Sequence, residues 1–278
     1  AVLDQTFTGT TTADILTVTG NLSVDGGTIK LDGNYPVGTN NVALGNESLN
    51  GSISGSENVA VGTYSLDATT SGSYNSGLGY AALSGNTTGG ANTAIGNGAL
   101  ISSTTGSYNT GLGASALLNN TTASDNTAVG YQAGRSNTTG SPITAIGRKA
   151  LYTNTTGADN TALGRNSLFY NTTGGDNTSS GNEAMQANTT GSYNTAYGSD
   201  SLRANTTAAA NTAVGYQALT TNTTGGDNAA FGYQAAQSNT TGDYLTAIGR
   251  QALYNNTTAD NNTAVGYKAA YSTTTGAY

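Results

Sequence analysis

Apolar residues recur along most of the chain with a fixed period of seventeen residues. A glycine returns at every step without insertion or deletion, usually after a small residue and an aliphatic residue, as in Ala213-Val214-Gly215. The glycines of this phrase are Gly45, Gly62, Gly79, Gly96, Gly113, Gly130, Gly147, Gly164, Gly181, Gly198, Gly215, Gly232, Gly249 and Gly266. Fourteen repeats therefore fill residues 41–278. Repetition this strict is typical of a repeat architecture rather than of an ordinary globular domain.

The length of the repeat favours a β-solenoid. Seventeen residues are too few for a helical-hairpin repeat of about 34 residues or a leucine-rich repeat of about 20–29 residues. Gly, Asn and β-branched Thr in most repeats also disfavour helix. One coil of short strands and turns needs about this many residues, and stacked coils pair as parallel strands about 4.8 Å apart. The sequence therefore predicts an all-β parallel solenoid of fourteen coils over residues 41–278.

Each position of the repeat, numbered from its first residue (Asn211, for example), has a character of its own. Position 5 is always Gly, which predicts a tight turn with positive φ or a contact too close for a Cβ atom. Positions 6, 7, 10 and 11 vary between polar and aromatic residues and are predicted to form the outer surface. Positions 4 and 9 are mostly aliphatic and are predicted to be core columns: Val129, Ile146, Leu163, Val214 and Ile248 at position 4, and Leu49, Leu66, Leu83 and Leu219 at position 9.

Small residues beside these columns predict that several chains pack together. Position 3 is usually Ala and position 8 is always Ala or Ser. Because adjacent residues of a strand point to opposite faces, Ala beside Val implies two dry faces. One face would line the coil, and the other would be buried against another chain. Ala128, Ala213 and Ala264 are assigned to this oligomer face.

Positions 12 to 15 read Asn-Thr-Thr-Gly or Asn-Thr-Thr-Ala in ten repeats. Asn and Thr side chains bond nearby backbone groups, and Gly supplies a left-handed turn residue. Identical stacked Asn side chains also bond one another in a ladder. The predicted ladder is Asn137, Asn154, Asn171, Asn188, Asn205, Asn222 and Asn239.

Other interpretations of the same region stay open. The Asn-X-Thr triplets are acceptors for N-glycosylation in a secretory route. A regular Thr column is a candidate ice-binding surface. Asp159 and Asp176, at position 17 of successive repeats, are candidate metal ligands, although the Gly-Gly-X-Gly-X-Asp pattern of calcium-binding β-rolls is missing.

Tyrosine is the residue type that points most directly to binding. The chain has 17 Tyr and no Trp, and five Tyr fall at position 6: Tyr80, Tyr131, Tyr216, Tyr233 and Tyr267. An exposed Tyr offers apolar area together with a hydroxyl group, which suits contact with a sugar or a protein. Stacking between coils is the alternative role for this column.

Composition removes several functional classes. With no His, no Cys and no catalytic motif, the sequence predicts a protein that is neither an enzyme nor dependent on a cofactor. The net charge of −7 and the scattered distribution of eight basic residues along the chain argue against a nucleic-acid partner. No apolar run approaches the length of about 18 residues that membrane insertion needs.

Residues 1–40 lie outside the repeat and form a separate predicted segment. Apolar and polar residues alternate between Leu16 and Leu31, and Gly-Asn and Asp-Gly turn signals interrupt the alternation. This pattern predicts three short strands. We expect them to cap or connect the first coil, since an open solenoid end exposes unpaired strand edges.

The phrases "NTAVG" and "TAIG" resemble the head repeats of trimeric autotransporter adhesins. The longer "NTAVGYQALTTNTTG" and the upstream "GNLSVDGGTIKLDGNYPVG" resemble bacteriophage fibre proteins, notably those of marine phages. The resemblance covers nearly the whole chain, although adhesin head repeats are usually shorter than seventeen residues. It implies a left-handed β-roll that assembles as a homotrimer, with three chains around one axis.

What this resemblance implies is a structural fibre protein of a virion, a shaft or head that gives rigid reach and multivalent host-surface binding. The expected location is the virion surface. The alternative is a bacterial cell-surface adhesin or a self-stacking extracellular filament. In each case the expected partners are further copies of the chain and a host cell-surface glycan or protein.

Overall fold

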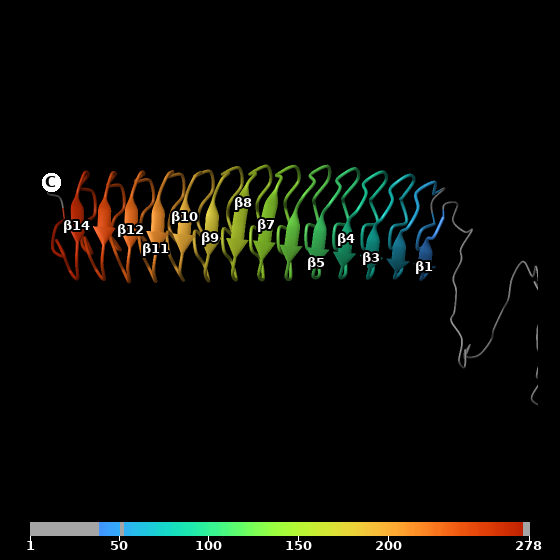
Figure 1. Ribbon diagram of the computed structural model, residues 1–278, viewed down its shortest axis with the longest axis horizontal. Helices are drawn as coiled ribbons and strands as arrows, with labels where there is room; N and C mark the ends of the chain where they lie inside the picture. The colour runs from blue at the N-terminus through green and yellow to red at the C-terminus, as the bar shows by residue number, and fades with distance from the viewer. Residues whose placement is uncertain (1–38, 51–52, 275–278) are drawn as a thin grey trace, which may run out of the picture. The chain divides into compact units, whose positions relative to one another are not determined.

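The computed structural model describes residues 39–50 and 53–274, and this part of the chain forms a parallel β-solenoid (Figure 1). Each repeat contributes one short strand, and the strands pair in chain order into one all-parallel sheet. They are β1 (Val42–Leu44), β2 (Val59–Val61), β3 (Ser76–Leu78), β4 (Thr93–Ile95), β5 (Thr110–Leu112), β6 (Thr127–Val129), β7 (Ile143–Ile146), β8 (Asn160–Leu163), β9 (Thr178–Ser180), β10 (Thr195–Tyr197), β11 (Thr212–Val214), β12 (Ala229–Phe231), β13 (Thr246–Ile248) and β14 (Thr263–Val265). The predicted fold class is confirmed, whereas the three strands expected before residue 39 lie outside the described residues.

The backbone ladder extends beyond the strands around the whole coil. In the sheet, Ala196 pairs with Ala213, seventeen residues later. Outside the sheet, the Leu219 N–H donates to the Ala235 carbonyl at 3.0 Å and the Thr223 N–H donates to the Thr240 carbonyl at 2.9 Å. Each coil therefore pairs its backbone N–H and C=O groups with those of the next coil in the same register. Thirteen steps of about 4.8 Å give a stack about 62 Å long.

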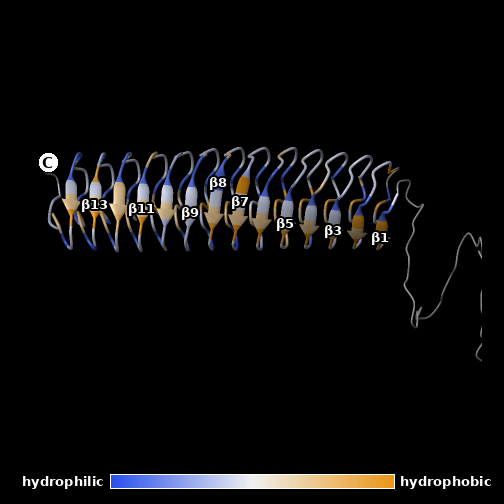
Figure 2. Ribbon diagram, viewed as in Figure 1, coloured by the Kyte–Doolittle hydropathy of each residue, from blue (hydrophilic) through white to orange (hydrophobic). Residues whose placement is uncertain are grey.

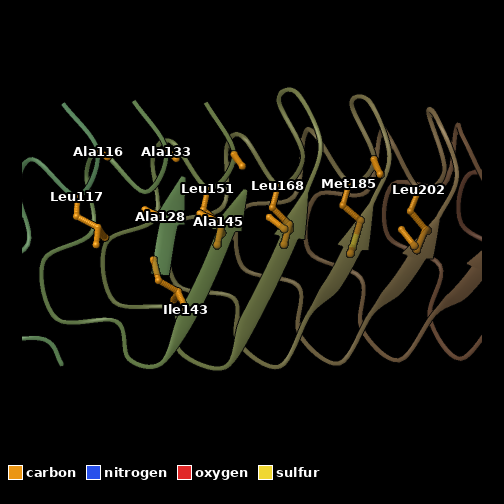
Figure 3. Close-up of a cluster of buried hydrophobic side chains, with 14 of the residues drawn as sticks. Ala116, Leu117, Ala128, Ala133, Ile143, Ala145, Leu151, Leu168, Met185 and Leu202 are labelled. Carbon is orange, nitrogen blue, oxygen red and sulfur yellow. The ribbon is translucent and has the colours of Figure 1, made fainter. Parts of the chain in front are cut away.

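The interior of each coil is a thin layer of small and aliphatic side chains from positions 3, 8 and 9. Leu117, Leu151, Leu168, Met185 and Leu202 form part of the position 9 column (Figure 3), and each of these side chains is fully buried. Ala at positions 3 and 8 fills the space on either side. The predicted core at position 9 is therefore confirmed.

The prediction for positions 3 and 4 was wrong, because the two positions have exchanged roles. Ala128, Ala213 and Ala264 lie in the core of a single chain, with exposed fractions of 0%, 0% and 5%, and so cannot form a face between chains. Position 4 instead points outward, as Ile146 and Ile248 do at 40% and 42% exposure. A Cβ atom on Gly111, at position 3, would lie 3.3 Å from Leu100 Cγ. Because Leu at position 9 occupies the interior, only a small residue fits opposite it.

Glycine at position 5 is required for both of the predicted reasons. Gly130, Gly147, Gly164, Gly215 and Gly249 have φ between +128° and +133°. A Cβ atom on Gly130 would lie 2.7 Å from the Gly147 carbonyl oxygen of the next coil. Only glycine, which has no side chain, therefore fits at this corner.

Three further positions adopt the left-handed conformation, mostly with non-glycine residues. They are positions 7, 9 and 17, for example Gln217, Leu219 and Asp227 with φ of 56°, 51° and 55°. Gly at position 15 is not among the residues with positive φ, so its predicted role as the left-handed turn residue was wrong. The neighbouring coils hold the three left-handed residues in place through backbone hydrogen bonds, as at Leu219.

The carbonyl of position 15 accepts hydrogen bonds from two buried Asn side chains of its own coil. In one coil, the Asn75 and Asn86 amides both donate to the Gly89 carbonyl, at 2.9 and 3.0 Å. The Asn at position 12 also donates to the same position of the preceding coil, as Asn154 does to Asn137 Oδ1 at 2.8 Å. The predicted Asn ladder is thereby confirmed. The bonds that join its seven members and Asn120 are Asn137 to Asn120, Asn154 to Asn137, Asn171 to Asn154, Asn188 to Asn171, Asn205 to Asn188, Asn222 to Asn205 and Asn239 to Asn222.

A second ladder, which the sequence analysis missed, runs through the Asn at position 1. Here Asn58 Oδ1 accepts from the Asn75 backbone N–H at 2.9 Å and from the Asn75 amide at 3.1 Å. Asn occupies position 1 in every repeat except those that begin with Ile143 and Leu245. Asn126 Oδ1 still accepts from the Ile143 backbone N–H at 2.8 Å, so the backbone half of the ladder continues.

The two exceptions are compensated within the core. Gly134 replaces the large residue at position 9 just before Ile143, and Ala236 does so just before Leu245. A Cβ atom on Gly134 would lie 3.4 Å from Ile143 Cδ1, and Figure 3 shows Ile143 between Leu117 and Leu151 along the stack. The Ile143 side chain therefore fills the space that a position 9 Leu fills elsewhere, which keeps the interior close-packed.

Substitution of Gly130 by Ala tests the position 5 corner. We expect Gly130→Ala to lower the free energy of unfolding by at least about 2 kcal/mol, because the added methyl group is strained at this φ and meets the next backbone. The matched control is Gly98→Ala, at position 7, where nothing lies within 4 Å of a Cβ atom. Denaturant unfolding followed by circular dichroism measures both variants, and equal losses would contradict the close-contact explanation.

Substitution of Ser103 by Asn tests the ladder at a natural gap. Ser103 occupies position 12, and both its hydroxyl and the oxygen Asn86 Oδ1 are buried without a hydrogen-bond partner. We expect Ser103→Asn to stabilise the chain by about 1–2 kcal/mol, because the new amide donates to Asn86 Oδ1. Ser103→Ala is the control and is expected to change stability by less than about 0.5 kcal/mol. An Asn variant no more stable than the Ala variant would argue against the ladder as a source of stability.

Candidate binding surface

The Tyr column at position 6 lies on the outside of the solenoid, as predicted for an outer surface. It follows the Gly at position 5, where the chain turns away from the sheet and directs the next side chain outward. The five predicted binding residues, Tyr80, Tyr131, Tyr216, Tyr233 and Tyr267, are all exposed. Their aromatic rings are accessible to a partner.

Position 6 is continuous with positions 7 and 10, and we call the three together the 6/7/10 surface. Side chains from these positions touch one another across successive coils. Gln237, at position 10, donates to Gln217 Oε1, at position 7, at 2.9 Å. The Lys268 Nζ atom lies 5.5 Å from the ring centre of Tyr267, at position 6, and 5.0 Å from that of Tyr271, at position 10.

The most extended aromatic cluster on this surface spans the coils of β11 to β14. Tyr216 and Tyr233 stack with ring centres 5.5 Å apart and an interplanar angle of 24°. The Arg250 guanidinium lies over the Tyr233 and Tyr267 rings, at 5.3 and 5.9 Å from their centres. Stacking between coils, given above as the alternative to contact with a partner, occurs here between side chains that are also exposed to solvent. Aromatic rings with an adjacent cation can contact both an apolar and an anionic part of a partner.

A second cluster lies in the coils of β6 to β8. Tyr152 and Phe169 stack with ring centres 4.9 Å apart. The Lys149 Nζ atom lies 5.2 Å from the Tyr152 ring centre, and the Arg135 guanidinium lies 5.7 Å from it on the same ring. The Arg148 guanidinium lies 6.0 Å from the Tyr131 ring centre. Position 10 thus contributes aromatic residues to this surface. The predicted binding residues were all at position 6 and did not include them.

The basic residues, which are scattered along the sequence, gather on the 6/7/10 surface. All seven basic residues of the described part occupy one of its three positions: Arg135, Arg148, Lys149, Arg165, Arg203, Arg250 and Lys268. Arranging the sequence by its seventeen-residue period would have revealed this gathering. The acidic residues of positions 16 and 17 lie at the other end of the strands (Figure 2), where hydrophilic residues predominate.

Two of the four acidic residues on the 6/7/10 surface, Glu183 and Asp200, are paired with these cations. The Glu183 carboxylate lies 3.4 Å from the Arg165 guanidinium and 3.3 Å from that of Arg203, while Asp200 lies 3.7 Å from Arg203. Asp67 differs: burial raises the pKa of its carboxyl, the nearby Glu47 carboxylate adds to the rise, and backbone N–H groups oppose it.

The candidate metal ligands Asp159 and Asp176 occupy equivalent corners of successive coils. Their backbone N–H groups donate to the Pro142 and Ala158 carbonyls at 2.8 and 3.0 Å. A hollow beside Asp159 is lined by Pro142, Ile143, Thr144, Asn160 and Thr161. In residues 39–50 and 53–274, no group of three or more acidic side chains is placed to hold a metal ion.

The Thr residues of positions 13 and 14 differ in their availability. At position 13 the hydroxyl bonds the next coil, as Thr155 Oγ1 donates to the Thr172 carbonyl at 2.9 Å. At position 14 the side chain is exposed, as at Thr156 and Thr173. Neighbouring Thr residues thus form one structural column and one surface column.

Comparisons of the chain with protein-family models, with curated proteins and with solved structures gave no match. The described residues contain no helix long and apolar enough to cross a membrane.

Replacement of the stacked pair Tyr216 and Tyr233 by Ala tests whether the column is a binding surface or part of the stabilising core. We expect the double variant to lose less than about 1.5 kcal/mol in free energy of unfolding, because both residues are 43% exposed and lie outside the core. Leu219→Ala, in the core of the same coil, is expected to lose about 2–5 kcal/mol. Chemical denaturation compares the two variants. A double variant as unstable as Leu219→Ala would assign the Tyr column to stability.

Proposed function

We propose that this chain is the rigid shaft or head segment of a virion fibre, as in a phage tail or head fibre, and acts as a homotrimer outside the cell. The single observation that carries the proposal is the uninterrupted ladder: the described coils stack with the same seventeen-residue step. Such a stack converts repeat number directly into length. A fixed length is the property that a fibre needs to hold a binding surface away from a particle.

The repeated 6/7/10 surface supports a second part of the proposal, multivalent attachment to a host cell-surface glycan or protein. Equivalent Tyr side chains recur at fixed heights, and three chains would present each of them three times. Weak contacts then combine, since a second contact on the same rod forms at high effective concentration. Stacked rings such as Tyr216 and Tyr233, with Arg250 beside them, are suited to a sugar that carries an acidic group.

Light scattering and negative-stain electron microscopy of the same sample test the fibre proposal. We expect a mass of about 83 kDa, for three chains of 27.6 kDa, and rods whose repeat region is about 62 Å long. A monomer would contradict the proposal. Rods that grow end to end far beyond one chain would instead favour the alternative of a bacterial surface filament or adhesin.

A glycan array tests the attachment proposal. We expect the wild-type protein to bind acidic glycans and the Tyr216→Ala, Tyr233→Ala double variant to lose at least about tenfold in apparent affinity. The control is Thr156→Ala, on the exposed position 14 column, which leaves the 6/7/10 surface unchanged. Equal binding by both variants would place attachment elsewhere on the rod.

A further inference from the structure

Charge is segregated between two edges of the solenoid. The 6/7/10 surface carries all seven described basic residues and four acidic ones, Glu47, Asp67, Glu183 and Asp200. Positions 16 and 17, which we call the acidic edge, carry no basic residue in the described part of the chain. Their acidic residues are Glu57, Asp125, Asp159, Asp176, Asp227, Asp243 and Asp260. The two edges lie at opposite ends of the strands, before position 1 and after position 5.

Some charges of the two edges also lie at the same height along the stack. In the coil of β7, Arg148 and Lys149 on one edge lie at the level of Asp159 on the other. In the coil of β13, Arg250 lies at the level of Asp260, while Asp227, Asp243 and Lys268 lie within two coils of this level. The coils of β2 to β4 have neither basic residues nor an acidic residue at positions 16 and 17.

The coils between these two levels neutralise their own charge. Arg203 lies within 3.3 Å of Glu183 and 3.7 Å of Asp200, and Arg165 also contacts Glu183. Those are the ion pairs found within the described residues, so the remaining basic side chains and the acidic edge are not paired with each other inside one chain. Charge that a chain leaves unpaired at matching heights is complementary to another copy of the same chain.

The outward face of the sheet lies between the two edges and is also suited to burial. Position 4 side chains such as Leu112, Ile146 and Ile248 are exposed there in one long column. At about 62 Å by about 10–15 Å, the face has about 600–900 Å², which is comparable to one side of a standard protein interface. The position 4 column forms the apolar part of this face, beside the mostly Thr residues of position 2.

We infer that copies of this chain associate side by side, parallel and without axial shift, with the basic 6/7/10 edge of one copy against the acidic edge of the next. Such a contact joins two different edges, so it closes into a ring when the rotation permits. In a ring of three, the outward sheet faces turn toward the common axis and bury the position 4 column. This inference rests on the proposed homotrimer alone and assigns its contact surfaces and its register. It places the 6/7/10 surface at the contact between copies and is therefore an alternative to the host-attachment role proposed for that surface.

Charge reversal at one level tests the inference. One variant carries Arg148→Glu and Lys149→Glu on the basic edge, a second carries Asp159→Lys and Asp176→Lys on the acidic edge, and a third carries all four changes. The control carries Glu at the exposed position 14 residues Thr122, Thr139, Thr156 and Thr173, which adds the same negative charge as the first variant. Analytical ultracentrifugation at low salt measures the concentration at which each oligomer dissociates, and circular dichroism checks that each variant folds.

We expect each single-edge variant to raise the dissociation concentration at least about tenfold, the combined variant to restore it to within about threefold, and the control to change it less than about threefold. The wild-type oligomer should also dissociate more readily as the ionic strength rises, which can be measured without any variant. If the wild-type protein is an oligomer but neither reversal nor salt affects it, this inference is overturned and the proposed fibre stands. If the combined variant is no better than the single-edge variants, the pairing of the two edges is wrong. A wild-type monomer would overturn both proposals.

Discussion

The rest of the structure depends on one constraint: the backbone polar groups inside the stack must be paired, most of them with residues of the neighbouring coils sixteen to eighteen positions away. Unpaired buried N–H and C=O groups cost as much free energy as a lost hydrogen bond, so a single inserted residue would break the pairing around the coil. The fourteen glycines at position 5 therefore follow one another at a constant interval. The same constraint holds residues such as Leu219 in a left-handed conformation that a free chain would avoid.

The buried side chains follow the same seventeen-residue repeat as the backbone. The two Asn ladders use the narrow space near position 15, where the Gly89 carbonyl receives both Asn75 and Asn86. The remaining space holds one large apolar side chain in most coils. Where that side chain is lost, as at Gly134, the neighbouring Ile143 supplies it instead. The loss of Leu from the position 9 column at Gly134 and the loss of Asn from the position 1 column at Ile143 thus occur together.

The outer surface is free of this constraint, and there the repeats differ from one another. Position 6 holds Tyr, Arg, Asn, Thr, Ser or Ala, and position 17 holds Tyr, Asp, Glu, Asn, Pro or Ala. The aromatic clusters and the two charged edges arise from this variation. Because the ladder fixes the height of every side chain, a change at one position alters a defined level of the rod. A surface of this kind suits repeated weak contacts with a partner and in-register contacts between copies.

The sequence by itself determined the period, the solenoid class, the glycine corner and the Asn ladder of position 12, because each depends on one residue type recurring at one interval. It did not determine which of positions 3 and 4 faces inward. Ala and Val are both apolar, and a strand of three residues such as β11 is too short for alternation to distinguish the two faces. The tertiary structure decided it, since the Leu column leaves room only for Ala, as the 3.3 Å distance from a Gly111 Cβ atom to Leu100 shows. The positions of Arg148, Lys149 and Arg250 in the repeat could be taken from the period, but only the stacked coils show that positions 6, 7 and 10 form one surface, because the folding of each coil decides which of its positions are neighbours.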